Sequence, residues 1–129
     1  MARTPQEQAQ VDKVMALYRE VLIPMDPAKV QQHLPPNYIQ HSSLAEPGLE
    51  PLKRFLAHVR QESPHAQQTI HRAFVEGDHV IVHVHVVRWP SDPGLAVVDI
   101  FRFENGAIVE HWDVIQEVPA KPINPNGMF

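Results

Sequence analysis

The chain has 129 residues, the length of one ordinary domain, and its 43% hydrophobic and 20% charged residues are typical of globular proteins. It contains no cysteine, which excludes disulfide frameworks and thiolate chemistry, and its formal net charge of -4 argues against nucleic acid as a partner. No apolar run is long enough to span a membrane and the N-terminus has no apolar signal core, so we expect a cytoplasmic protein.

The first half of the chain predicts three helices. Residues 4–7, Thr-Pro-Gln-Glu, form a capping box, and apolar residues then recur at spacings of three and four until Pro24 ends the helix. A short second helix is expected from Asp26 to Leu34, and a third from Leu49 to Gln61. The intervening segment 37–41 is expected to be a loop or a short extended piece.

After Pro64 the pattern changes to the period of two that is typical of strands. Strands are expected at 69–76 and 79–89, and the stretch 95–118 reads as a hairpin turned at Asn105-Gly106. Helices followed by an antiparallel four-stranded meander predict an α+β fold, with the sheet curled around the helices and a cavity between them. We expect one domain over residues 1–129, with a helical part at 1–62, a sheet at 67–118 and an irregular tail at 119–129.

Two carboxylates, Asp99 and Asp113, lie inside the apolar arms of this hairpin, where aspartate is disfavoured and costly to bury without partners. A two-residue loop at Asn105-Gly106 would place them on opposite faces of the sheet. A three-residue loop would place Asp99 opposite His111 and diagonal to Asp113, all on one face. We favour the three-residue loop because it lets the charged side chains on both faces find partners.

The strand 79–89 alternates valine and histidine, so His83 and His85 share one face. We expect these histidines to face the cavity beside the carboxylates, and the predicted catalytic set is Asp113, Asp99, His83 and His85. With an Asp or His from a neighbouring strand the histidine pair could bind zinc or iron, but a lone His-x-His motif is weak evidence and we expect no bound metal.

The remaining candidates concern the rim of the cavity and the outside of the sheet. Tyr38 and His41 are expected to close the mouth of the cavity and orient a carbonyl. The predicted substrate-binding set is Tyr38, His41, His71, Phe101 and Trp112. The other sheet face is expected to be apolar and to form a two-fold homodimer; its members are Val80, Val82, Val84, Val86, Val98, Ile100, Trp112 and Val114.

Several segments carry a resemblance to a known family. They are Tyr-Ile-Gln-His at 38–41, Glu-Gly-Asp at 76–78, Asp-Ile-Phe-Arg at 99–102 and Glu-His-Trp-Asp at 110–113. The chain resembles SnoaL-like proteins, relatives of polyketide cyclases with the cone-shaped fold of nuclear transport factor two. The tail at 124–129 is similar to that of a bacterial branch described as predicted aldol-condensation enzymes.

The resemblance implies a cone-shaped α+β barrel, a deep pocket and often a dimer through the sheet. It implies that Asp113 takes the place of the acid/base aspartate of the cyclases, which need no metal or cofactor. Asp99 stands where the cyclases have an assisting histidine, so at this position the chain departs from the residues that perform the cyclase reaction.

Two classes of function follow. One is an enzyme that transfers protons next to a carbonyl, in aldol cyclisation, isomerisation or lyase chemistry, without a cofactor. The alternative is a non-catalytic module that binds a small apolar molecule, and a less favoured reading is a metal-dependent His/Asp enzyme. In each case we expect a small apolar or carbonyl-containing ligand, and neither nucleic acid nor a membrane as partner.

Overall fold

The computed structural model describes residues 2–129, and every element below lies in that range; the domain start predicted at residue 1 lies outside it. Helix α1 (Pro5–Leu17) begins with the expected capping box, in which Thr4 and Glu7 exchange hydrogen bonds of 3.0 and 3.1 Å. The helix then continues as a π-helical segment, Tyr18–Leu22, with i→i+5 hydrogen bonds. Such π-helical turns within α-helices are frequent at functional sites.

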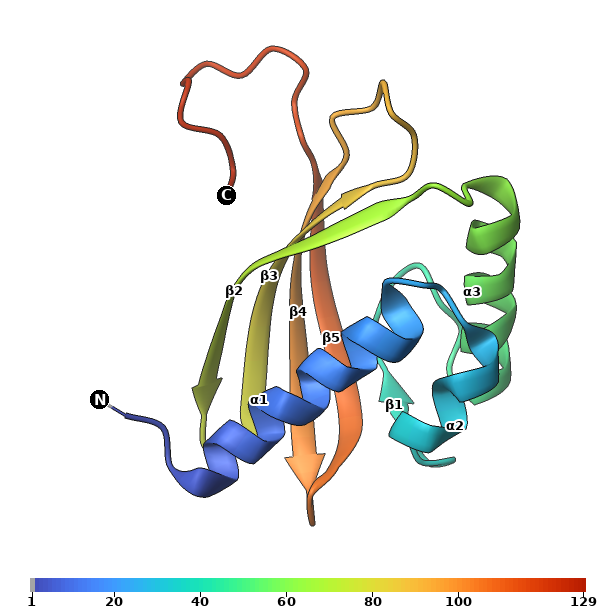
Figure 1. Ribbon diagram of the computed structural model, residues 1–129, viewed down its shortest axis with the longest axis vertical. Coiled ribbons are helices and arrows are strands. Elements are labelled where there is room, and N and C mark those ends of the chain that lie inside the picture. Colours follow the sequence, from blue (N-terminus) through green and yellow to red (C-terminus); the bar gives the residue numbers. More distant parts are fainter. Residues whose placement is uncertain (1) are drawn as a thin grey trace.

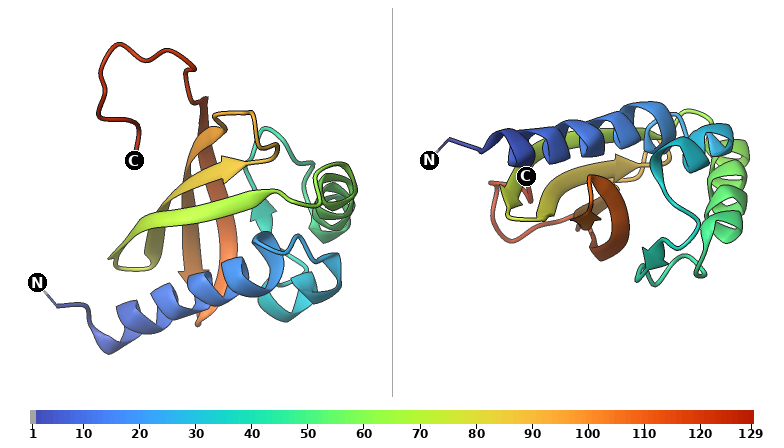
Figure 2. Two further views of the ribbon diagram at one scale, coloured as in Figure 1. Left: turned by 45° about the horizontal axis from the view of Figure 1, so that its top comes forward. Right: turned by 90° about the horizontal axis from the view of Figure 1, so that it is seen from below.

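The expected second helix is split between a 3₁₀ turn, Pro27–Lys29, and α2 (Val30–His33), and Asp26 caps its start. Helix α3 (Leu49–Glu62) buries Leu52, Leu56 and Val59 along one side. These helices cover one face of the sheet, while the C-terminal tail lies toward the other (Figures 1 and 2).

Five strands form one sheet in the order β1-β5-β4-β3-β2. Four of them are the expected antiparallel strands: β2 (Gln67–Glu76), β3 (His79–Val87), β4 (Leu95–Glu104) and β5 (Ala107–Glu117). The fifth, β1 (Ile39–Gln40), pairs in parallel with the outer edge of β5. The α+β prediction is confirmed, and its strand count is corrected from four to five because the extended piece at 37–41 joins the sheet.

The predicted faces of β3 are wrong. Val80, Val82 and Val84 have no exposed surface and pack in the core with α1 and Phe101. Val82 lies opposite Asp99, so the valine face of β3 is the cavity face and the histidine face is the outer one. The valines lie on the inner face because burying three apolar side chains is favourable, whereas imidazoles need polar partners when buried.

The hairpin turn is the two-residue one, with Asn105 and Gly106 both at positive φ (50° and 77°), rather than the three-residue loop that we favoured. Glu104 pairs with Ala107 across it, but an irregularity next to Phe103 leaves Val109 as an extra residue in β5. The bulge shifts the register by one, so the two aspartates lie on one face after all.

Candidate functional site

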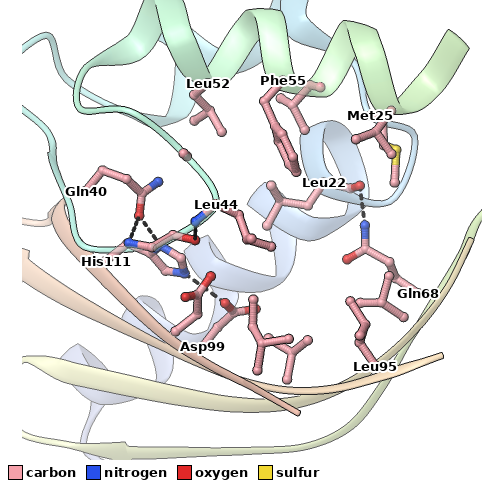
Figure 3. Close-up of a pocket in the computed structure, with 18 of the residues that line it drawn as sticks. Leu22, Met25, Gln40, Leu44, Leu52, Phe55, Gln68, Leu95, Asp99 and His111 are labelled. Atoms are coloured by element: carbon pink, nitrogen blue, oxygen red, sulfur yellow. Dashed lines mark hydrogen bonds and ion pairs between the residues drawn. The ribbon is translucent and has the colours of Figure 1, made fainter. Parts of the chain in front are cut away.

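A cavity of about 370 Å³ lies between the helices and the inner face of the sheet (Figure 3). Most of its wall is apolar, and the polar side chains gather mainly at the end where β1, β4 and β5 meet. The apolar wall comprises Leu22, Met25, Leu44, Ala45, Leu52, Phe55, Leu56, Val59, Val86, Leu95, Val97 and Ile115. The polar lining comprises Gln40, Ser42, Gln68, Arg88, Asp99, His111 and Asp113.

At the polar end, Asp99 and His111 form a buried pair. His111 Nε2 lies 2.8 Å from Asp99 Oδ1, and the side chains are 12% and 11% exposed. The Tyr18 hydroxyl donates to the other carboxylate oxygen, Oδ2, from the first residue of the π-helical segment. Both oxygens of Asp99 therefore have partners, as a buried carboxylate requires.

Two tyrosines beside this pair stay protonated. Burial, and then the negative charge of Asp99, raises the pKa of Tyr18 well above its usual value. The same two causes raise the pKa of Tyr38, whose hydroxyl accepts a hydrogen bond of 3.2 Å from Gln40 Nε2. Both phenols therefore remain neutral at physiological pH, and Tyr18 remains a hydrogen-bond donor to Asp99.

Asp113 lies directly opposite Asp99 in the ladder between β4 and β5 and lines the same cavity. Among the side-chain hydrogen bonds formed by residues 2–129, none ends on its carboxylate. The site thus combines an aspartate with two fixed partners and an aspartate whose oxygens are free to meet a ligand. That difference in environment is how two carboxylates acquire separate roles.

Asp99, His111 and Asp113 could also hold a metal ion, and they are the one such group of three in the described part of the chain. Single ligand atoms of Asp99, His111 and Asp113 all lie within 4.8 Å of one another. These donor types suit a divalent cation such as zinc or manganese. A cation would have to compete with His111 for Asp99 Oδ1, because that oxygen already has a partner at 2.8 Å.

The structure does not bring His83 and His85 to the carboxylates. Both lie on the outer face of the sheet, where His83 Nδ1 contacts the Arg72 guanidinium and His85 Nε2 donates to the Pro93 carbonyl at 2.7 Å. His71 lies with them, and the Phe129 ring stacks on all three imidazoles at centroid distances of 4.4–5.2 Å. Their predicted places in the pocket are therefore corrected for all three histidines.

The other predicted residues are divided between the two faces. Phe101 is buried between Tyr18 and His111 and packs against both rings of the polar end. His41 and Trp112 stack on each other on the outer face, with ring centroids 4.9 Å apart, so neither reaches the cavity. Tyr38 is buried behind Gln40 instead of closing a mouth.

Sequence reasoning missed Tyr18 and Gln40. It placed His111 on the face of the two aspartates in the favoured register but did not count it among the site residues. Tyr18 falls on the apolar face of a predicted helix, where a tyrosine reads as core, and its contact lies 81 residues along the chain. A signal for Gln40 did exist, because it lies within the segment 38–41 that resembles the family. Nothing in the spacing shows that this segment pairs with β5.

Residues 14–111 match the family model described as the SnoaL-like domain, which is more than half of the chain. The chain belongs to the SnoaL-like family. No curated protein sequence matches it. The resemblance predicted from the sequence is therefore confirmed at the level of family and fold.

Several solved structures have the same fold. TsrD from Streptomyces laurentii is 21% identical, with a TM-score of 0.62 over 89% of this chain and 91% of that one. A proposed SnoaL-like polyketide cyclase from Jannaschia sp. CCS1 is 19% identical, with a TM-score of 0.69 over 89% and 90%. AclR from Streptomyces galilaeus, a proposed hydroxylase, is 20% identical, with a TM-score of 0.62 over 87% and 79%. At these identities the likeness establishes the fold alone.

No helix within residues 2–129 combines the length and the apolar character that a membrane crossing requires.

Proposed function

We propose that this SnoaL-like protein is an acid/base enzyme that acts next to a carbonyl of a small, largely apolar molecule. The proposal rests on one observation: at the end of the cavity where most of its polar side chains gather, Asp113, which has no side-chain partner, lies beside the hydrogen-bonded Asp99–His111 couple. A volume of about 370 Å³ falls in the usual range of small-molecule sites, about 300–1,000 Å³.

In this proposal Asp113 is the base. It removes a proton from the carbon next to the substrate carbonyl, since its oxygens have no competing partner. The Asp99–His111 couple holds one proton between Oδ1 and Nε2 and offers it to the carbonyl oxygen as negative charge develops there. At the enolate stage Asp113 holds the proton taken from carbon, while the proton of the couple bridges to the enolate oxygen, so no proton is lost from the site.

The reaction types compatible with this cycle share an enolate. In an isomerisation, Asp113 returns the proton to a different carbon of the substrate. In an aldol closure, the enolate carbon attacks a second carbonyl, whose oxygen takes the proton of the couple. The proton held by Asp113 then passes to the couple and restores the starting state. The family resemblance favours aldol closure, and the names of related proteins include a proposed cyclase and a proposed hydroxylase.

The second candidate function is a non-catalytic module that binds a small apolar ligand. It is favoured by the wall of the cavity, where apolar side chains outnumber the polar ones. In that case the carboxylates would only orient a polar group of the ligand.

Hydrogen–deuterium exchange separates the two candidates without the natural substrate. Apolar cyclic ketones that fit the cavity, such as 2-tetralone, are incubated with the protein in D₂O, and loss of the proton next to the carbonyl is followed by NMR. The enzyme should exchange this proton faster than buffer, and Asp113→Asn should slow exchange by about 10²–10⁴-fold. Ketones that bind but exchange at the buffer rate would support the binding module instead.

We also propose a homodimer through the outer face of the sheet. Because the valines of β3 face inward, the apolar surface that could form the dimer is smaller than the sequence predicted. It consists of Phe74, Ile81, Val98, Ile100, Trp112 and Val114. Phe74 and Val114 are 57% and 64% exposed, and exposed apolar residues that gather on one face mark an interaction surface. A cytoplasmic location remains part of the proposal.

A further inference from the structure

The two-residue strand β1 places Gln40 beside His111. Gln40 is the register partner of His111 across the parallel pairing of β1 with β5, and the His41 backbone N–H extends that pairing by donating to the His111 carbonyl at 2.9 Å. Gln40 Oε1 lies 2.7 Å from His111 Nδ1 (Figure 3). The edge strand therefore brings an amide to the nitrogen that faces away from Asp99.

The orientation of this amide is decided by a third group. The backbone N–H of Ser42 meets the same end of the Gln40 amide at 3.0 Å, and a backbone N–H can only donate. The atom it meets must be the oxygen. The other end of the amide, Nε2, then donates to the Tyr38 hydroxyl at 3.2 Å, which completes a consistent set of bonds. A flipped amide would set two donors against each other at Ser42.

An oxygen at Nδ1 requires a proton on Nδ1. We infer that Gln40 is a positioning residue that holds His111 with its proton on Nδ1, so that Nε2 is left to share a single proton with Asp99. The Tyr18 hydroxyl donates to Asp99 Oδ2, so the shared proton is confined to the Oδ1–Nε2 contact of 2.8 Å. The pair of Asp99 and His111 is then neutral as a whole.

The inference rests on the proposed function only for its kinetic consequence. With the opposite tautomer, Nε2 would carry its proton permanently to Asp99, Nδ1 would be bare, and the couple would have no spare proton for a developing oxyanion. In Ser-His-Asp proteases, a catalytic histidine held in the wrong tautomer loses rate even when its geometry is intact. The tautomer itself can be measured without any substrate.

The test is NMR of protein labelled with ¹⁵N-histidine, in spectra that distinguish protonated from bare ring nitrogens. His85 supplies the matched control, because its Nε2 donates to the Pro93 carbonyl and its neutral form must carry the opposite proton. The His111 and His85 signals are assigned with His111→Gln and His85→Gln. Wild-type His111 should carry a proton on Nδ1 at every pH at which the protein is folded, whereas neutral His85 should carry it on Nε2.

Two variants of Gln40 then separate its chemistry from its shape. Gln40→Met has a similar length and no acceptor, so the proton of neutral His111 should move to Nε2, where Asp99 still accepts it. Gln40→Glu keeps the oxygen, so Nδ1 should stay protonated as in the wild type. If Gln40→Met does not fold, Gln40→Ala, which also removes the acceptor, takes its place in the comparison with wild type.

A bare Nδ1 in wild-type His111, or a His111 signal that is the same in wild type and Gln40→Met, would overturn the inference. If the tautomer changes in Gln40→Met but ketone exchange does not slow, the positioning role in catalysis is refuted. If wild-type protein exchanges no ketone at all, the proposed function fails while the tautomer result stands.

Discussion

Asp99 and Asp113 are direct cross-strand partners on the cavity face of the sheet, and they differ in what surrounds them. Asp99 accepts from Tyr18 and meets His111, whereas Asp113 has no side-chain hydrogen bond among residues 2–129. Like charges opposite each other on a sheet are destabilising, so the pair is a cost that packing alone does not explain. We therefore attribute the pair to the chemistry of the site rather than to the stability of the fold.

Replacing Asp113 by asparagine should abolish most activity and leave the fold intact. The amide keeps the shape of the carboxylate and removes the base, so ketone exchange should fall by about 10²–10⁴-fold. It also removes one of two facing charges, so the free energy of unfolding should stay the same or rise. The matched control is Asp12→Asn, an exposed aspartate on α1 that should change neither quantity. Wild-type exchange rates in Asp113→Asn would show that it is not the base.

Replacing Tyr18 by phenylalanine should destabilise the protein. The change leaves Asp99 Oδ2 buried without its donor, which costs about 1–3 kcal/mol in the free energy of unfolding. Urea unfolding of Tyr18→Phe, Asp99→Ala and the double variant measures this through a double-mutant cycle. The effects of the two changes should not add, because each removes the same contact. Strict additivity would mean that the tyrosine acts through packing on Phe101 alone.

A charge on the outer sheet face should prevent dimer formation. Val114 is 64% exposed on that face, so Val114→Lys would bury an unpaired charge in the proposed interface. Light scattering at micromolar concentration should give a dimer for wild type and a monomer for the variant. Ile23→Lys, at an exposed apolar position on the helical side, should remain dimeric. A wild-type monomer under these conditions would dismiss the proposed interface.

Glu110 should make stability depend on pH in the acid range. Hydrogen bonds from His41 and then from Arg102 lower the pKa of Glu110, whose side chain is 15% exposed. A carboxylate with a lowered pKa in the folded state adds stability above its usual pKa, and this stability is lost as pH falls through the lowered value. Between pH 6 and pH 3, Glu110→Gln should therefore lose less stability than wild type in urea unfolding.

The control for this experiment is Glu46→Gln, since Glu46 is an exposed glutamate in the loop before α3. It should keep the full acid sensitivity of the wild type. Parallel acid profiles for wild type and Glu110→Gln would show that the contacts with His41 and Arg102 add nothing to stability.

The sequence predicted the architecture better than the site. Periodicity separates the helices from the strands, and the placement of Asp99 and Asp113 on one face was correct although the turn behind it was wrong. The pattern of alternation in β3 could not say which face is inside, because valines and histidines alternate equally well in either orientation. We placed the histidines in the cavity because of their chemistry, but in the structure the valines are buried there because they are apolar.

The residues that complete the polar end were beyond local reasoning. Tyr18, Gln40 and His111 come from three elements that are far apart in the chain, and their meeting depends on how β1 pairs with β5 and how α1 crosses the sheet. Periodicity reports the environment of one element at a time. It carries no information on the partner that a polar side chain will find in another.

The π-helical segment Tyr18–Leu22 sets the phase of the helix around its axis. Its hydrogen bonds, from Ile23 N–H to the Tyr18 carbonyl and from Asp26 N–H to the Val21 carbonyl, accommodate one residue more per turn than an α-helix does. Removing the exposed Arg19 would restore α-helical winding and rotate the two ends of the segment relative to each other by about 100°. Either Tyr18 would then leave Asp99 or Leu22 would leave the cavity wall. A single inserted residue thus lets one continuous helix serve both the proton network and the ligand pocket.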